Sequence, residues 1–281
     1  MKKHYVLPSV IALGGVGGFI LRLMQNRTGF DDATGLPVPG NMAGIALIAL
    51  LVAVAALLAL QAFRLPEQTD PPAEFPSDFS TTDAALLMFP VAGVFLMGLS
   101  GALDILLGAG ILTATTVALP GIGTLLLFAG DTFSSTVHLV MGALTLASTF
   151  ALLPAVLACR RRTHLNSRLE SATLVVPVIA LVIRLVLTYR VDSMNPSLSV
   201  YYVHLLTLIF LTLGFFRLSA FAFGSGRIRP FALYAGCAAV LTLTLLADLN
   251  APLASSLLYL GGSAVLVGCL ILLLEKQSER K

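Results

Sequence analysis

Apolar segments of about 20 residues recur along almost the whole of this 281-residue chain. Each is long enough to cross roughly 30 Å of hydrocarbon as a helix. Charged residues make up only 11% of the sequence, whereas soluble domains carry about 25%. Ten-residue segments of alternating polarity, which are typical of membrane β-barrels, are absent. The sequence therefore predicts an all-α, polytopic transmembrane helix bundle without a soluble domain. The predicted spans are residues 5–24, 43–63, 84–103, 137–158, 172–189, 198–223, 230–247 and 255–274.

Residues 105–130 leave the number of spans open. This stretch is apolar, but glycines and a proline interrupt it, so it could be an extra span or a re-entrant segment packed against protein. Short cytoplasmic loops gather Lys and Arg. With eight spans and both termini inside, the arginines at 160–162 lie inside and only Arg22, Arg27 and Arg190 lie outside. We therefore predict eight spans in the plasma membrane, with cytoplasmic termini, and nine spans as the alternative.

Residues 64–83 form the one substantial hydrophilic segment, and they are rich in proline and acidic side chains. Such a composition buries too little apolar surface to offset the entropy lost on ordering. We predict an extended or disordered cytoplasmic loop, on which a partner protein could dock.

Arg184 lies inside an apolar run, six residues before Arg190, which is about 9 Å along a helix. A charge at this depth costs a few kcal/mol and is usually paired or exposed to water. We predict an outward-facing ligand site that comprises Arg184, Tyr189, Tyr201 and His204. The carboxylates that could pair with the arginine are Asp104, Asp131, Asp192 and Asp248. In the alternative, Arg184 makes one structural ion pair and the tyrosines are interfacial anchors.

Three further arginines lie towards the inner side. Arg217 is near the inner end of its span, and Arg227 and Arg229 follow in a glycine-containing turn. This turn lacks the lysine–hydroxyl pair of a nucleotide-binding loop and follows no strand. We therefore predict that the three side chains contact anionic lipid.

Signatures of other functional classes are missing from the sequence. It contains no H-E-x-x-H, no G-x-S-x-G and no close pair of intramembrane carboxylates, so we expect neither catalytic residues nor an enzyme. The three cysteines lack metal spacing, and we expect no metal and no cofactor. No basic array stands beside exposed aromatic residues, so nucleic acid is not an expected partner.

Several short motifs flank the predicted spans. They are Thr34-Gly35-Leu36, Thr188-Tyr189-Arg190, Asn195-Pro196, Phe221-Ala222-Phe223-Gly224-Ser225-Gly226-Arg227 and Leu246-Ala247-Asp248. In these motifs the chain resembles a group of uncharacterised multi-spanning membrane proteins from anaerobic Gram-positive bacteria. The resemblance covers the two ends of the chain better than residues 105–130. It implies a multi-spanning architecture and no particular activity.

Two functions are open at this point. The first is a small-solute carrier or permease-like component, whose outer polar pocket takes a small anionic solute. The alternative is a non-catalytic sensory or scaffold subunit that contacts another membrane protein. A wet cavity beside Arg184 would favour the carrier, and a dry ion pair would favour the scaffold.

Overall fold

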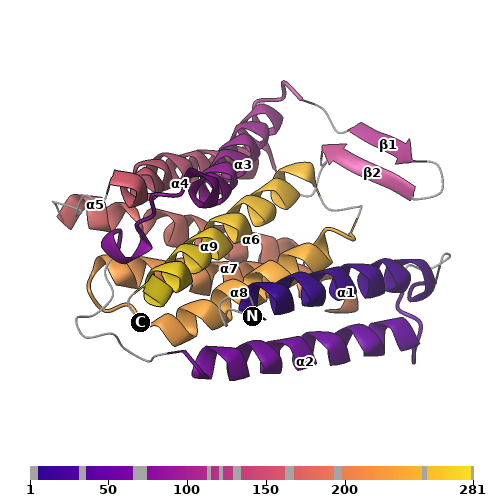
Figure 1. Ribbon diagram of the computed structural model, residues 1–281. Coiled ribbons are helices and arrows are strands. Elements are labelled where there is room, and N and C mark those ends of the chain that lie inside the picture. The colour runs from indigo at the N-terminus through magenta and orange to yellow at the C-terminus, as the bar shows by residue number, and fades with distance from the viewer. Residues whose placement is uncertain are drawn as a thin grey trace.

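The computed structural model describes residues 6–31, 36–65, 75–112, 115–119, 123–128, 134–161, 168–192, 198–248 and 252–279. Within these ranges, eight helices are long and apolar enough to cross a membrane, which confirms the predicted helix bundle (Figure 1). They are α1 (Val6–Thr28), α2 (Met42–Phe63), α3 (Ala84–Gly108), α4 (Ser135–Arg161), the stretch Ser171–Val191 that includes most of α6 (Val176–Asp192), α7 (Leu198–Ala222), α8 (Ile228–Leu245) and α9 (Leu253–Glu279). A short helix, α5 (Arg168–Thr173), precedes α6.

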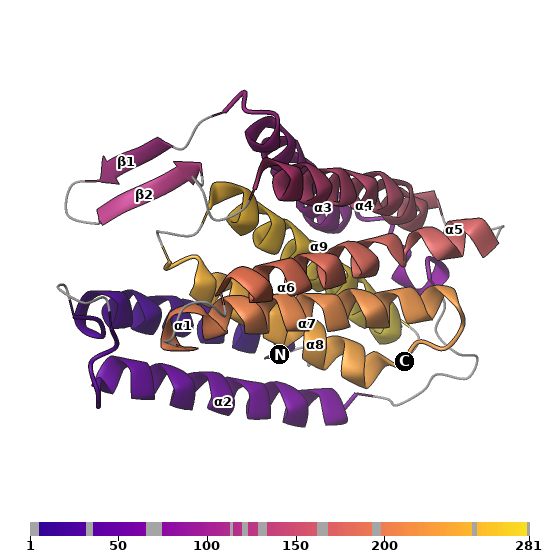
Figure 2. The same ribbon diagram turned by 180° about the vertical axis from the view of Figure 1, so that it is seen from behind.

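The two ends of the bundle differ in the segments that they carry. At one end, which we call the hairpin end, lie a β-hairpin and the turn between α1 and α2 (Figures 1 and 2). At the opposite end, which we call the basic end, α2 finishes at Phe63 and α8 begins at Ile228. Basic residues in or next to the helix ends at the basic end include Arg64, Arg160, Arg227, Arg229 and Lys276.

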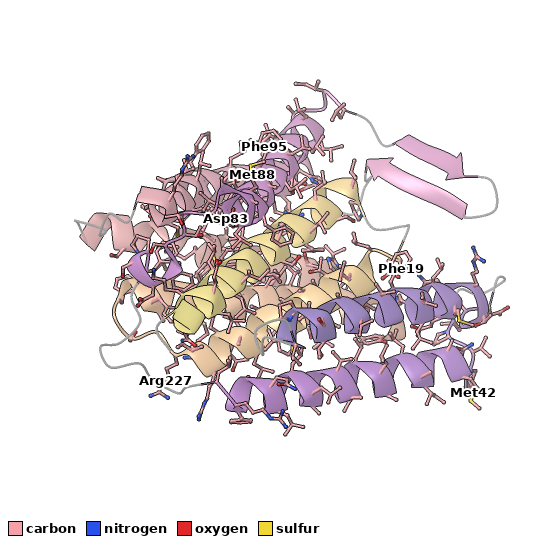
Figure 3. The ribbon with its side chains drawn as sticks, in the orientation of Figure 1. Phe19, Met42, Asp83, Met88, Phe95 and Arg227 are labelled. Atoms are coloured by element: carbon pink, nitrogen blue, oxygen red, sulfur yellow. The ribbon has the colours of Figure 1, made fainter. Side chains whose placement is uncertain are left out.

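Large apolar side chains cover the outside of the bundle. Phe19, Met42, Met88 and Phe95 are all exposed and stand on the outer faces of α1, α2 and α3 (Figure 3). Exposed apolar surface of this extent is costly in water but is what hydrocarbon solvates well. The exterior therefore agrees with a multi-pass membrane protein.

Helix α8 occupies the interior. It contacts α1, α2, α7 and α9, and it is lined with small residues such as Ala235, Gly236 and Ala239. Small side chains let several helix backbones approach one another closely, which is the main source of packing energy between helices in lipid.

Glycine pairs bring α3 against α9 and α4. A Cβ atom added to Gly93 would lie 2.6 Å from the carbonyl oxygen of Gly261, and one added to Gly261 would lie 2.6 Å from the carbonyl oxygen of Gly93. Gly101 and Gly142 meet in the same way between α3 and α4. Only glycine permits these backbone contacts, so the three helices form one closely packed layer.

The structure changes the interpretation of residues 105–130. Helix α3 continues through Gly108, and strands β1 (Thr115–Leu119) and β2 (Gly123–Phe128) form an antiparallel hairpin in which Val117 pairs with Leu125. A ninth helical span is absent from the described part of this region. The physical reason is that Pro120, Gly121 and Gly123 fall within four residues of the apolar run, and together they lower its helix propensity more than the single prolines inside α3 and α4 do.

Part of the predicted disordered loop is ordered. Residues 66–74 of the segment 64–83 lie outside the described residues, but Phe75 and Phe79 are buried. The Phe79 ring meets Phe221 of α7 and Phe231 of α8 at centroid distances of 5.3 and 6.3 Å. The average composition of the segment does not reveal these two phenylalanines. Each buries a large apolar surface, which can hold the adjacent residues in place. Within the predicted extended or disordered loop, residues 75–83 are therefore ordered.

Candidate functional site

Arg184 forms a dry ion pair with Asp104. Its Nη1 donates to Asp104 Oδ2 at 2.9 Å, and the two residues are only 4% and 2% exposed. Of the two predicted partners whose side chains the structure describes, Asp104 and Asp248, Asp104 is the one that meets the arginine. This contact joins α6 to α3, two helices that both pack against α4.

Further polar side chains extend this pair into a buried polar network. Arg184 Nη2 donates to Ser255 Oγ at 3.0 Å, and the Tyr259 hydroxyl lies beside the guanidinium. On the other side, His138 Nδ1 lies 3.4 Å from Asp104 Oδ1. His204 Nε2 hydrogen-bonds to the Tyr259 hydroxyl. The network runs through His138, Asp104, Arg184, Ser255, Tyr259 and His204, which come from α4, α3, α6, α9 and α7.

The network lies within the span region, towards the hairpin end. Asp104 is four residues before the end of α3 and His138 is three residues after the start of α4, so each is about 5–6 Å from a helix terminus. Arg184 is the middle residue of α6, about 12 Å from either terminus. A charge at such depth is costly unless it is paired, and each charged member of the network has its partner.

The described contacts connect two of the four residues of the predicted ligand site. Arg184 and His204 are joined through Tyr259, whereas Tyr189 is 57% exposed on α6. Tyr201 is half-buried on α7. Asp131 and the side chain of Asp192 lie outside the described residues. Arg184 and His204 thus belong to one closed network, to which α9 contributes Ser255 and Tyr259.

Asp248 pairs with a different arginine. Both Nε and Nη2 of Arg22 donate to its carboxylate, at 2.7 and 2.9 Å, and Asn26 donates to it at 2.7 Å. Arg22 is 2% exposed, and its guanidinium stacks 5.8 Å from the ring centre of Tyr202. This second buried pair ties α1 to the end of α8.

Sequence reasoning missed several of these partners. Arg22, Gln25 and Asn26 recur at the three-to-four-residue spacing of one helix face, and this spacing could have indicated a polar face on α1. Tyr259 and Ser255 gave a similar signal on α9, where they are four residues apart. A single tyrosine or serine in an apolar run is too common to stand out without that spacing.

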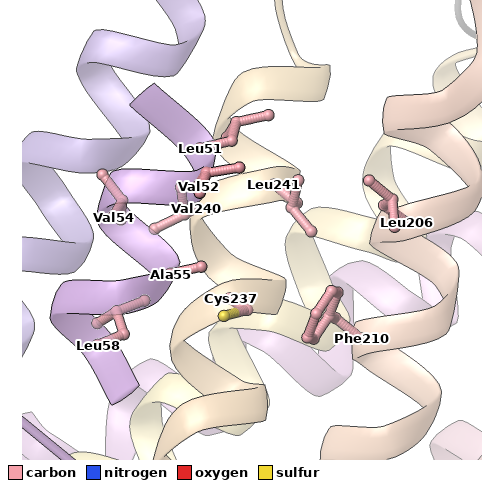
Figure 4. Close-up of a pocket in the computed structure, with 10 residues that line it drawn as sticks. All are labelled: Leu51, Val52, Val54, Ala55, Leu58, Leu206, Phe210, Cys237, Val240 and Leu241. Carbon is pink, nitrogen blue, oxygen red and sulfur yellow. The ribbon is translucent and has the colours of Figure 1, made fainter. Parts of the chain in front are cut away.

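The three inner arginines line one cavity of about 290 Å³ at the basic end. A second cavity, of about 180 Å³, is formed by apolar residues of α2, α7 and α8 (Figure 4). Within the residues that the structure describes, no group of three His, Cys, Asp or Glu side chains is placed to hold a metal ion.

No protein-family model, curated protein or solved structure matches this chain.

Proposed function

We propose that this protein is a plasma-membrane carrier for a small anionic solute, in which the buried polar network is the closed form of the pathway at the hairpin end. A dry Arg184–Asp104 pair alone would favour a scaffold; the observation that carries the proposal is the wider network of His138, Tyr259 and His204 around that pair, which one structural ion pair does not need. Apolar side chains of the same volume would often hold helices together as well or better. Charged groups inside membrane proteins are instead typical of solute and ion pathways.

The network contains the groups that such a carrier needs. In an open form, Asp104 would keep its contact with His138, because the imidazole already lies beside that carboxylate. The Arg184 guanidinium would then be released to bind a carboxylate or phosphate group of the solute, for which its planar fork is suited. Solute and Asp104 would compete for the same donors, so binding would be linked to opening.

The proposed orientation places the basic end in the cytoplasm. Arg64, Arg160, Arg227, Arg229 and Lys276 lie there, whereas Arg27 and Arg190 lie at the hairpin end. This asymmetry is the one that short cytoplasmic loops have in membrane proteins. The carrier would therefore open through its hairpin end to the outside.

The second candidate is a non-catalytic scaffold subunit. The low exposure of Arg184 and Asp104 favours it, because a permanently dry pair can only fix helix positions. In this case the network never opens to water, and the protein acts through contacts with another membrane protein.

Thiol labelling distinguishes the two candidates without knowledge of the solute. Ser255→Cys places a thiol beside Arg184, while Cys159, Cys237 and Cys269 of the unmodified chain are buried and give the background. Val38→Cys, at an exposed position of the hairpin end, is the fully accessible control. A membrane-impermeant thiosulfonate reagent is applied to intact cells, and the labelled fraction is followed with time.

The carrier requires that Ser255→Cys is labelled above background, and faster when Asp104→Asn weakens the closed form. If Ser255→Cys stays at the level of the buried native cysteines, even with Asp104→Asn, the pathway does not open and the scaffold is favoured.

A further inference from the structure

The two cavities lie on the same faces of the same three helices. The basic cavity is lined by residues of α2 from Ala59 to Phe63 and of α8 from Arg229 to Leu233. The apolar cavity continues along α2 with Leu51, Ala55 and Leu58, and along α8 with Cys237 and Leu241. On α8 the lining positions recur at four-residue intervals, which is the spacing of one helix face. We call this continuous surface the α2–α8 groove.

The basic part of the groove contains a guanidinium without a full set of partners. Arg217 Nε is buried and has no hydrogen-bond partner among the described residues, although its guanidinium lies 5.6 and 5.9 Å from the rings of Phe216 and Tyr234. A buried donor without an acceptor is costly. An anion in this cavity would supply the acceptor.

The other groups around this part of the groove favour an anion as well. Arg229 is held in place by donation from Nε to the carbonyl oxygen of Leu65 at 2.8 Å, and Arg227 also lines the cavity. Helix α8 begins here at Ile228 without a side-chain cap, so the positive end of its dipole faces the same end of the groove. Planar guanidinium groups match the oxygen atoms of a phosphate.

The apolar part of the groove fits a hydrocarbon chain. Its lining includes Val54, Leu206, Phe210 and Val240 and contains only apolar side chains and one cysteine (Figure 4). From Arg229 to Leu241 is twelve residues, or about 18 Å along the helix, which is close to half of a bilayer's roughly 30 Å hydrocarbon core. Leu57, Leu60 and Phe63 on α2 are exposed, so the groove borders the lipid-facing surface.

We propose that the α2–α8 groove is a binding site for an anionic phospholipid. The phosphate lies among Arg217, Arg227 and Arg229, and one acyl chain lies along Leu58, Cys237 and Leu241. Because the three arginines alone would also attract free phosphate, the acyl contact is the feature that identifies a lipid. The phosphate part of this site lies at the basic end, away from the buried polar network, and the site does not depend on the proposed transport role.

The test measures lipid binding to the purified full chain by native mass spectrometry. Phosphatidylglycerol and phosphatidylcholine with identical acyl chains are added to delipidated protein, and inorganic phosphate is added as a competitor. Three variants are compared with the unmodified chain. Arg227→Gln removes one charge at an exposed position, Ala55→Phe fills the apolar part, and Arg160→Gln is a control at an exposed arginine outside the groove.

The site requires that phosphatidylglycerol binds more tightly than phosphatidylcholine. Arg227→Gln should weaken phosphatidylglycerol binding roughly fivefold, as expected for one basic residue near a lipid phosphate. Ala55→Phe should weaken the binding of both lipids, and Arg160→Gln should change neither. The thermal unfolding midpoint of each variant shows whether it is folded. Arg217→Lys, which retains the positive charge, provides a second variant inside the cavity.

Two outcomes would overturn the proposal. Equal binding of the two lipids, unaffected by Arg227→Gln, would exclude an anion-selective site. Displacement of phosphatidylglycerol by inorganic phosphate, together with unchanged lipid binding in Ala55→Phe, would identify a free-phosphate site instead.

Discussion

At the scale of single residues, two arginines are held at membrane depth by carboxylates far away in the sequence. Arg184 meets Asp104 and Arg22 meets Asp248, and in each pair the arginine is almost fully buried. Removal of one partner from such a pair leaves an uncompensated charge, whereas removal of both does not. The two kinds of substitution should therefore differ strongly in their effect on stability.

We expect Arg184→Met alone to lower the free energy of unfolding by about 3–5 kcal/mol, because Asp104 is then buried with only His138 beside it. The double variant Arg184→Met/Asp104→Leu should recover most of this loss, since neither charge remains. Unfolding in detergent micelles, titrated with denaturant, measures both. Arg160→Met, at an exposed arginine, is the matched control and should be nearly neutral. A double variant as unstable as the single one would contradict the account.

At the scale of helices, close packing depends on glycine at particular crossings. The reciprocal contact of Gly93 and Gly261 joins α3 to α9, and Ser100 Oγ donates to the carbonyl oxygen of Ala254 at 2.6 Å a short way along the same interface. The crossing thus sets the distance between the helices that supply Asp104 and Ser255 to the network.

Gly93→Ala should destabilise the protein by about 1–3 kcal/mol, as overpacking of a close contact does. The added Cβ atom would lie 2.6 Å from the Gly261 carbonyl oxygen, so the helices must separate. Ala92→Leu adds more volume at an exposed neighbouring position and should have little effect. The midpoint of thermal unfolding in detergent compares the two variants. Equal midpoints would show that this crossing does not limit the packing.

The aromatic anchor Phe79 connects the segment before α3 to the rest of the bundle. Truncation of a buried phenylalanine costs about 3–5 kcal/mol, and we expect Phe79→Ala to fall in this range because its ring meets Phe221 and Phe231. Phe95→Ala makes the same substitution at a side chain that is 74% exposed, and it is the control. Faster proteolysis at residues 75–83 in Phe79→Ala alone would locate the loss of order. Similar losses of stability in both variants would contradict an anchoring role.

At the scale of the whole molecule, the sequence was sufficient for the helices but not for their contacts. Hydrophobic length identified all eight spans, because the need to cross hydrocarbon with every backbone group satisfied leaves few alternatives. It also identified Arg184 and Asp104, since charges in apolar runs are rare. The choice between Asp104 and Asp248 as the partner could not be made, because it depends on which helices are neighbours. Tyr259 escaped notice for the same reason.

The topology is the prediction that tests the whole arrangement at once. In the proposed topology, eight crossings place the β-hairpin end and the basic end on opposite sides of the membrane, and the arginine distribution favours a cytoplasmic basic end. Ile111→Cys and Phe223→Cys introduce thiols at exposed positions of the hairpin end and the basic end, respectively. With a membrane-impermeant reagent, Ile111→Cys should be labelled in intact cells and Phe223→Cys only after the membrane is permeabilised. The unmodified chain, whose cysteines are buried, gives the background.

The reverse labelling pattern would invert the proposed orientation and place the polar network near the cytoplasm. Labelling of both thiols in intact cells would contradict a chain that crosses the membrane between them.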